Sequence, residues 1–169
     1  MGKSNRRNEK YEHFTKMIRP MMLTDAWKAL SSTAQALYPW IKFEWKGPKS
    51  NNNGKISLSA RQAAELLGVS KDTANRAFHD LQAKGFLVVT EAASLGVDGH
   101  GKCCKYEITE IALPHQRDGR CLYKTWVAGN DYEIVKAVAA NPSGRREKPL
   151  HNIWDGPVID FKTIRNSLS

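Results

Sequence analysis

The chain has 169 residues, of which 26 are lysine or arginine and 17 are aspartate or glutamate, so its net charge is +9. That length is about one domain, and a domain of this size builds a core without a disulfide or a structural metal. An apolar share of 41% and a charged share of 25% are typical of a globular protein and exclude a wholly disordered chain. The excess of positive charge favours a polyanionic partner, most often nucleic acid.

The same features argue against a membrane or secreted protein. No apolar stretch approaches the roughly 18 residues of a membrane span. The N-terminus is basic with no apolar segment behind it, so it does not resemble a secretory signal. Three cysteines, with Cys103 and Cys104 adjacent, provide no disulfide framework. We therefore expect a cytoplasmic protein with no membrane contact.

Charge is distributed unevenly along the chain. Both ends are more basic than the middle, which is typical of arms around a packed core. We expect a basic N-terminal arm over residues 1–20, a folded domain over residues 21–112 and a C-terminal extension over residues 113–169.

The first part of the folded domain reads as two helices and a loop. Thr24 can cap a short helix over residues 25–30. A longer helical run covers residues 31–45, where apolar residues recur at spacings of three and four. Pro39 removes one hydrogen bond from this run and predicts a kink or a position in the first turn. Residues 47–54, rich in Gly, Pro and Asn, are expected to form a loop.

A short strand over residues 55–58 and a third helix come next. Ser59 begins this helix and forms a capping box with Gln62, three residues later. Gly68 ends it, because glycine adopts a positive φ at little cost. The apolar face of this helix is predicted to consist of Ala63, Ala64, Leu66 and Leu67.

A fourth helix follows after a break of only three residues. It begins at Ser70, stops at Gly85 and has an inner stripe of Ala74, Ala77, Phe78 and Leu81. Residues 86–91 and 103–111 then alternate as strands do. In the second of these strands, one face is predicted to carry Cys104, Tyr106 and Ile108.

Helix, three-residue turn, helix and β-hairpin occur in the order of a winged helix-turn-helix. The run LSARQAAELLGVSKDTANRAFHDLQAKGF, within residues 56–93, resembles winged helix-turn-helix proteins of bacterial phages, plasmids and integrated mobile genetic elements. With the upstream runs LTDAWKALSSTAQALY and NNGKISLS, the resemblance covers roughly residues 17–111. It implies an α+β fold, a winged helix with additional N- and C-terminal elements. Family members serve as transcription regulators and replication initiators, so it also implies DNA binding in a bacterial cytoplasm, at the nucleoid when bound.

The second helix of the pair is the candidate recognition helix. Its inner stripe leaves outside the polar residues Lys71, Asp72, Thr73, Asn75, Arg76 and His79. Arginine can grip guanine with two hydrogen bonds and asparagine can do so with adenine, whereas Ser, Thr and Lys reach phosphates. We expect phosphate contacts from Ser59, Arg61, Ser70, Lys102 and Lys105. The alternative is a solvated face on a winged helix that binds protein instead.

The wing departs from the usual pattern. Its connection, AASLGVDGHGK, has few charges, although a minor-groove wing usually offers Arg or Lys at its tip. Either the wing becomes ordered on contact, with Lys102 and Lys105 on phosphates, or it is a mobile tip that contributes little.

Two chemical motifs in this region fail on inspection. Residues 96–103 follow the phosphate-binding pattern G-x-x-x-x-G-K, but Cys103 replaces the hydroxyl that coordinates magnesium and a strand follows where a helix is needed. The nearby cysteines and histidines match no zinc spacing, and Cys103 and Cys104 point to opposite faces of a strand. No catalytic constellation is readable. We therefore expect no enzyme activity, metal, cofactor or small-molecule ligand.

The two ends leave alternatives open. The basic stretch Asn5 to Lys16 fits either an arm along DNA or a frayed terminus. Beyond Pro114 a loop is expected, followed by a helix over residues 131–140. The C-terminal residues Trp126, Trp154, Val158, Ile159 and Phe161 are too apolar for a plain tail, so they either dock on the winged helix or form an oligomer contact.

These observations predict sequence-specific binding of double-stranded DNA. The protein would act as a transcriptional regulator, as a homodimer because one module reads few base pairs. A replication initiator or accessory protein of a plasmid or phage is the alternative within the same class. A winged helix that mediates protein–protein contacts is the alternative from a different class.

Overall fold

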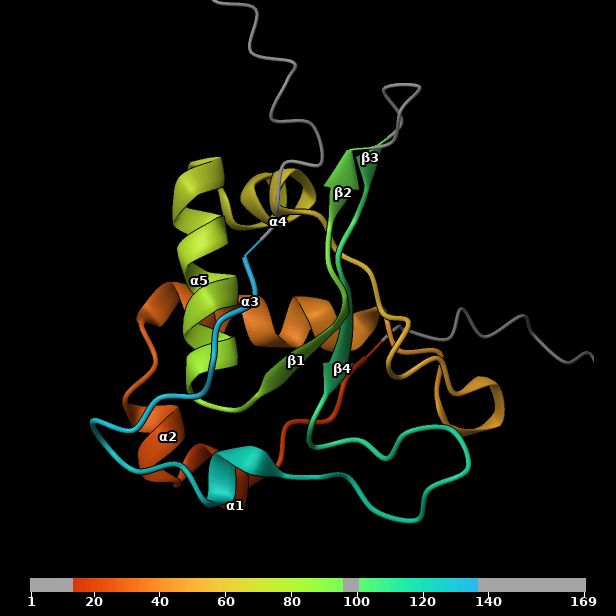
Figure 1. The fold of residues 1–169 in the computed structure, drawn as a ribbon. Coiled ribbons are helices and arrows are strands. Elements are labelled where there is room, and N and C mark those ends of the chain that lie inside the picture. The colour runs from red at the N-terminus through yellow and green to blue at the C-terminus, as the bar shows by residue number, and fades with distance from the viewer. Residues whose placement is uncertain (1–13, 96–100, 137–169) are drawn as a thin grey trace, which may run out of the picture.

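The computed structural model describes residues 14–95 and 101–136 and has a mixed α+β architecture (Figure 1). The helices of this part are α1 Arg19–Met22, α2 Asp25–Lys28, α3 Ser32–Phe43, α4 Ala60–Leu67 and α5 Lys71–Ala83, with 3-10 turns η1 Pro48–Ser50 and η2 Leu122–Lys124. The strands are β1 Leu87–Glu91, β2 Ser94–Leu95, β3 Gly101–Lys102 and β4 Lys105–Ile108. Among the described residues, no helix has the length and apolar character needed to cross a membrane.

Side-chain caps begin α2, α3, α4 and α5, and three of them, Thr24, Ser59 and Ser70, are the ones predicted from the sequence. The hydroxyl oxygens of the cap residues each accept a backbone N–H three positions ahead, and these residues are Thr24, Ser31, Ser59 and Ser70. The capping box of Ser59 and Gln62 is present, and Gly68 ends α4 in the left-handed conformation with φ 65°. Pro39 lies inside α3, which continues through it to Phe43.

The core lies between α3, α4, α5 and the strands. The predicted inner stripe of α5 is buried, at Ala74, Ala77, Phe78 and Leu81. Trp27, Tyr38 and Phe86 contact one another edge-to-face with ring centroids 5.5–5.6 Å apart. The prediction for Leu66 is wrong: its side chain is 43% exposed, because α4 turns only its neighbours Ala63 and Ala64 fully inward.

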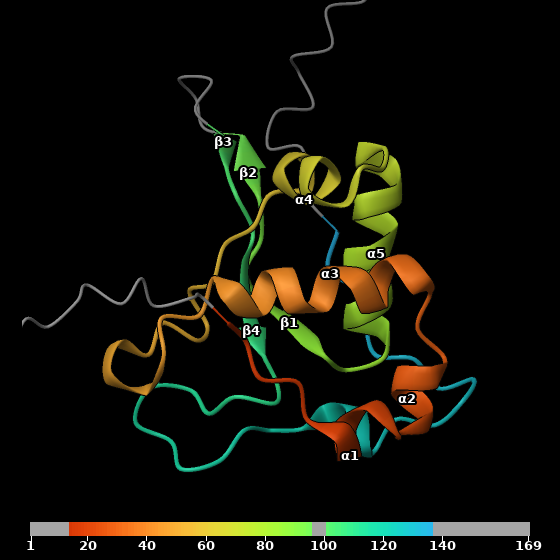
Figure 2. The same ribbon diagram turned by 180° about the vertical axis from the view of Figure 1, so that it is seen from behind.

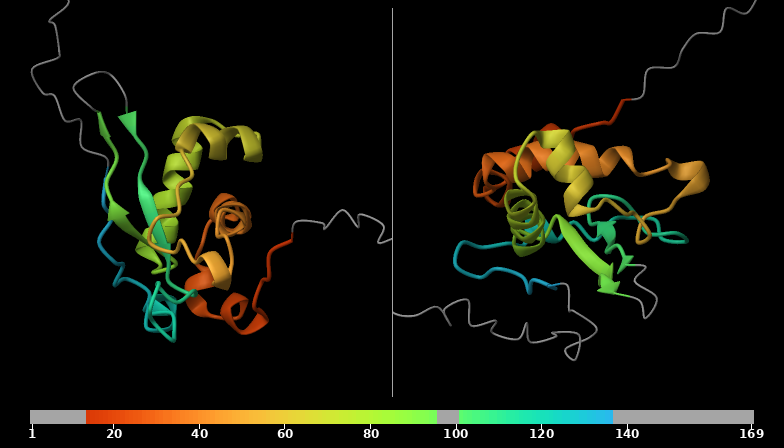
Figure 3. Two further views of the ribbon diagram at one scale, coloured as in Figure 1. Left: turned by 90° about the vertical axis from the view of Figure 1, so that its right-hand side faces the viewer. Right: turned by 90° about the horizontal axis from the view of Figure 1, so that it is seen from above.

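The strands form a narrow antiparallel ribbon beside α5, with α3 on the other side in the left view of Figure 3. β1 pairs with β4 from Leu87 opposite Ile108 to Glu91 opposite Lys105, and β2 pairs with β3 beyond an irregularity after Val89. The predicted face of the second strand is confirmed, since Tyr106 and Ile108 are buried and Cys104 packs against the core.

Two predicted strands are shorter than the sequence suggests. Residues 55–58 form only an isolated bridge, in which Tyr106 donates its N–H to the carbonyl of Ile56 at 2.8 Å. Of the strand predicted over residues 103–111, only β4, Lys105–Ile108, is present. The chain turns at Thr109, whose hydroxyl donates a hydrogen bond to the carbonyl of Gly85.

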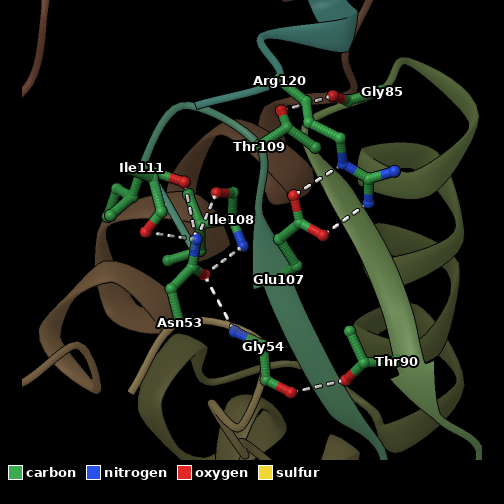
Figure 4. A network of polar contacts seen from close by, with 10 residues as sticks. Asn53, Gly54, Gly85, Thr90, Glu107, Ile108, Thr109, Ile111 and Arg120 are labelled. Carbon is green, nitrogen blue, oxygen red and sulfur yellow. Dashed lines mark hydrogen bonds and ion pairs between the residues drawn. The ribbon is translucent and has the colours of Figure 1, made fainter. Parts of the chain in front are cut away.

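Residues 113–136 pack against the base of the domain. Phe86 stacks on Tyr123 at 4.9 Å, and Arg120 makes a bidentate ion pair with Glu107, which is 2% exposed on the outer face of β4 (Figure 4). The helix predicted over residues 131–140 is wrong for residues 131–136, which are irregular. Their amides bond outward instead: Tyr132 donates to the carbonyl of Ala83 at 2.9 Å. Residues 137–140 lie outside the described part.

A buried ion pair holds the start of the described chain. Lys42 and Glu110 lie 2.9 Å apart with side chains that are each 5% exposed, and the hydroxyl of Tyr38 donates to the same carboxylate. The Lys42 ammonium also donates to the carbonyl of Lys16. Burial and the Glu110 charge raise the pKa of Tyr38 well above its usual value.

Candidate nucleic-acid interface

One end of the molecule brings together α4, the first turns of α5 and the β2–β3 ribbon (Figures 1 and 2). The three-residue turn between α4 and α5 sets their angle, and the inner stripe of α5 fixes which way that helix faces. The arrangement therefore places the start of α5 and the ribbon at the same end of the molecule.

The predicted contact residues all lie on the surface or at its margin. Exposed side chains are those of Arg61, Ser70, Lys71, Asp72, Arg76 and Lys102. Half-buried side chains are those of Ser59, Thr73, Asn75, His79 and Lys105. Seven of these residues belong to α5 or its cap, and they are Ser70, Lys71, Asp72, Thr73, Asn75, Arg76 and His79.

Two backbone N–H groups at the start of α5 have no hydrogen-bond acceptor within the helix. The amides of Lys71 and Asp72 open the helix and have no intrahelical acceptor. The Ser70 hydroxyl accepts from the amide of Thr73 at 3.1 Å and lies 2.9 Å from its hydroxyl, so both are engaged within the cap. Phosphate at this helix start would therefore meet backbone N–H groups and the positive end of the helix dipole, rather than the Ser70 hydroxyl.

Arg76 is partly oriented by its own helix. Its guanidinium donates to the Thr73 hydroxyl at 3.4 Å, which uses one of its five donors and leaves the rest of the fork exposed. Asn75 has no hydrogen bond from its side-chain amide within the described part of the chain. Both side chains thus keep the two-pronged ends that a base edge requires.

The acidic residues of α5 have different roles. Asp72 is exposed in the first turn, where a negative charge stabilises the helix. Asp80 instead accepts the amide of Ser31 at 2.7 Å and so attaches α5 to the start of α3. The sequence did not reveal this contact, because residues 31 and 80 are far apart in the chain.

The two predicted wing lysines differ in their surroundings. Lys102 is exposed on β3, whereas the Lys105 ammonium is paired with Glu91 across the ribbon. The hydrogen bond from Lys105 holds the pKa of the Glu91 carboxyl below its usual value. Lys105 therefore has a carboxylate partner that a phosphate would have to displace. The predicted wing tip, residues 96–100, lies outside the described part.

The C-terminal end of α5 is covered by residues 126–135. Gln82 is buried, and its side-chain oxygen accepts the amide of Val135 at 3.0 Å. Lys84 forms an ion pair with Asp131 at 2.8 Å and lies over the ring of Trp126. The accessible surface of α5 is therefore limited to its first turns.

The candidate metal ligands do not converge among the described residues. Within residues 14–95 and 101–136, no three His, Cys, Asp or Glu side chains gather in a way that would hold a metal ion. Cys103 is exposed, whereas Cys104 and Cys121 are half-buried free thiols. Cys104 accepts the amide of Ala93 at 3.2 Å, so it belongs to the ribbon.

Comparison with known proteins adds no relative: no protein-family model, no curated protein and no solved structure matches the chain.

Proposed function

We propose that the described part of the chain is a winged helix-turn-helix that binds double-stranded DNA sequence-specifically, in a transcriptional regulator. The observation that carries the proposal is the start of α5. The backbone amides of Lys71 and Asp72 have no intrahelical acceptor there, and the side chains of Lys71, Asn75 and Arg76 are exposed or half-buried beside them. The +9 charge of the chain supports an anionic partner.

In this proposal the start of α5 enters the major groove. Arg76 and Asn75 read guanine and adenine edges, and the Asp72 carboxylate is suited to accept from the amino group of cytosine. The α5 amides, Lys71 and Arg61 contact phosphates, and Lys102 does so from the ribbon. A single helix start covers few base pairs, so two copies on two half-sites would supply the specificity of a regulator.

A duplex selected from a random pool and a scrambled duplex of equal length test this proposal. Binding to both should weaken steeply with salt, and the selected duplex should be bound about a thousandfold more tightly at physiological salt. Equal binding to both duplexes contradicts sequence-specific recognition. Binding to neither favours a winged helix that contacts protein. Protection of a promoter, rather than of a replication origin, in a footprint separates a regulator from an initiator.

A further inference from the structure

A second concave surface lies on the side of the molecule away from α5. The loop after α3 and residues 111–117 after β4 enclose a cleft of about 740 Å³, within the range of ligand-binding pockets. Figures 1 and 2 both place η1 and this later loop opposite α5. The cleft therefore plays no part in the DNA interface proposed above.

The lining of this cleft combines apolar and polar side chains with basic ones. Apolar side chains come from Trp45, Ile111 and Leu113, and the rim carries Lys49, His115 and Arg117. No aspartate or glutamate is among the described residues that line it. The side chains of Lys49 and Arg117 make no hydrogen bond or ion pair with the described part of the chain. An occupant should therefore combine bulky apolar groups with negative charge.

The two walls are joined by a fixed set of hydrogen bonds. The Asn51 side chain accepts from the indole N–H of Trp45 at 2.9 Å and donates to the carbonyl of Ala112 at 3.0 Å. The cleft is thus formed before any ligand binds. The Asn51 oxygen also accepts the amide of Asn53 at 3.0 Å, so a single side-chain N–H of Asn51 is left for a ligand.

One stretch of this chain has the matching chemistry. The 13 residues between Lys148 and Lys162 contain Asp155 and Asp160 and no lysine or arginine, in a chain whose net charge is +9. The same stretch contains Trp154, Val158, Ile159 and Phe161. These residues lie outside the described part of the chain.

The length of the intervening chain permits a contact within one molecule. Eighteen residue steps separate Lys136 from Trp154 and span at most about 60 Å. A domain of this size is about 35 Å across, so the segment can reach any part of its surface. Tethering also supplies an effective concentration on the order of 1 mM, so weak intrinsic affinity is sufficient. A contact between two copies would bring together two chains of net charge +9, which repel each other, whereas a contact within one chain does not.

We propose that the acidic, aromatic segment of residues 154–161 docks in the cleft between Trp45–Asn51 and Ile111–Arg117 of the same chain. Its aromatic side chains contact Trp45, Ile111 and Leu113, and its two carboxylates contact Lys49 and Arg117. This assigns a specific docking site to the C-terminal apolar residues, which composition alone left between docking and oligomerisation.

The proposal is tested by measuring amide hydrogen exchange of the two cleft walls in full-length variants with reversed charges. The variants K49E/R117E and D155K/D160K should each accelerate exchange at residues 45–51 and 111–117 about tenfold, the protection given by a dissociation constant near 0.1 mM. The combined variant, with all four charges reversed, should restore protection. The matched control K28E/K124E changes the charge equally at exposed lysines outside the cleft and should leave exchange unchanged.

A second variant, W154A/F161A, keeps every charge and should lose the same protection. Wall exchange that is unchanged in D155K/D160K or in W154A/F161A overturns the proposal. Protection that disappears on dilution of the wild-type protein also overturns it, because the segment would then come from a second copy. Circular dichroism of each variant verifies that the fold is intact.

Discussion

Two asparagine-containing regions of this protein look equally polar in the sequence and serve opposite purposes in the structure. At the start of α5, Asn75 has no side-chain partner among the described residues. In the loop before α4, Asn53 is 2% exposed and fully engaged: its oxygen accepts the amide of Ile108, and its nitrogen donates to the carbonyls of Ile108 and Ile111 (Figure 4). A polar side chain that makes its hydrogen bonds inside the protein stabilises the fold, whereas one without hydrogen-bond partners is available to bind another molecule.

The largest effect should come from substituting Asn53. Asn53→Ala removes the side-chain partner of the amides of Ile108 and Gly54 and of the carbonyl of Ile111. Each unpaired group costs about 1–3 kcal/mol, so we expect a loss of about 4 kcal/mol in unfolding free energy. Denaturant titration measures it. Asn75→Ala is the matched control, with a change below about 0.5 kcal/mol. Comparable losses in both variants would remove the contrast between the two regions.

The two glycines that flank α4 and α5 give the next largest effect. Gly68 and Gly85 both have positive φ, at 65° and 75°. An added Cβ at Gly68 has open space, whereas at Gly85 it would lie 2.8 Å from the ring of Tyr132 and 3.0 Å from Leu122. We expect Gly68→Ala to cost about 1 kcal/mol and Gly85→Ala about 3 kcal/mol, since strain is joined by overpacking. Equal losses in thermal unfolding would mean that residues 122–132 yield freely.

These pairs also show which features of the structure could be predicted from the sequence. Caps, the left-handed Gly68 and the inner stripe of α5 were predictable because they depend on residues within one or two turns. The role of Asn53 was not, because its partners lie 55 and 58 residues away. The helix predicted over residues 131–140 failed at residues 131–136 for the same reason: the amides of Tyr132 and Val135 bond to α5 rather than along their own chain. The face of the candidate recognition helix could be read from periodicity, whereas the Lys105–Glu91 pair on the ribbon could not.

Within the proposed DNA interface we predict that Arg76 of α5 specifies the sequence and that Lys102 of β3 anchors the protein to phosphate. Arg76→Ala should cost about 1–3 kcal/mol on the selected duplex and little on the scrambled one. Lys102→Ala should weaken both alike and reduce the salt slope by about one unit. Salt titrations of each variant on both duplexes measure these effects. Equal losses on the two duplexes for Arg76→Ala would make that residue a phosphate contact.

The smallest effect should come from the ion pair between Asp131 and Lys84 at the C-terminal end of α5, which we expect to stabilise the fold through charge rather than packing. The Asp131 carboxylate accepts from the Lys84 ammonium and from the indole N–H of Trp126, both at 2.8 Å, and the Lys84 hydrogen bond is the main cause of its lowered pKa. Because the pKa is lower in the folded state, this stabilisation is complete above about pH 4 and is lost as the pH falls through the folded value. The Asp131 side chain is 48% exposed, so solvent screening limits the stabilisation to about 0.5 kcal/mol. Asp131→Asn should therefore lower the melting temperature by about 2 °C at pH 7 and by nothing measurable near pH 2. Lys84→Met should behave alike, and the double variant should lose less than the sum of the two. A deficit that persists at pH 2 would show that Asp131 acts through packing against Trp126 and not through its charge.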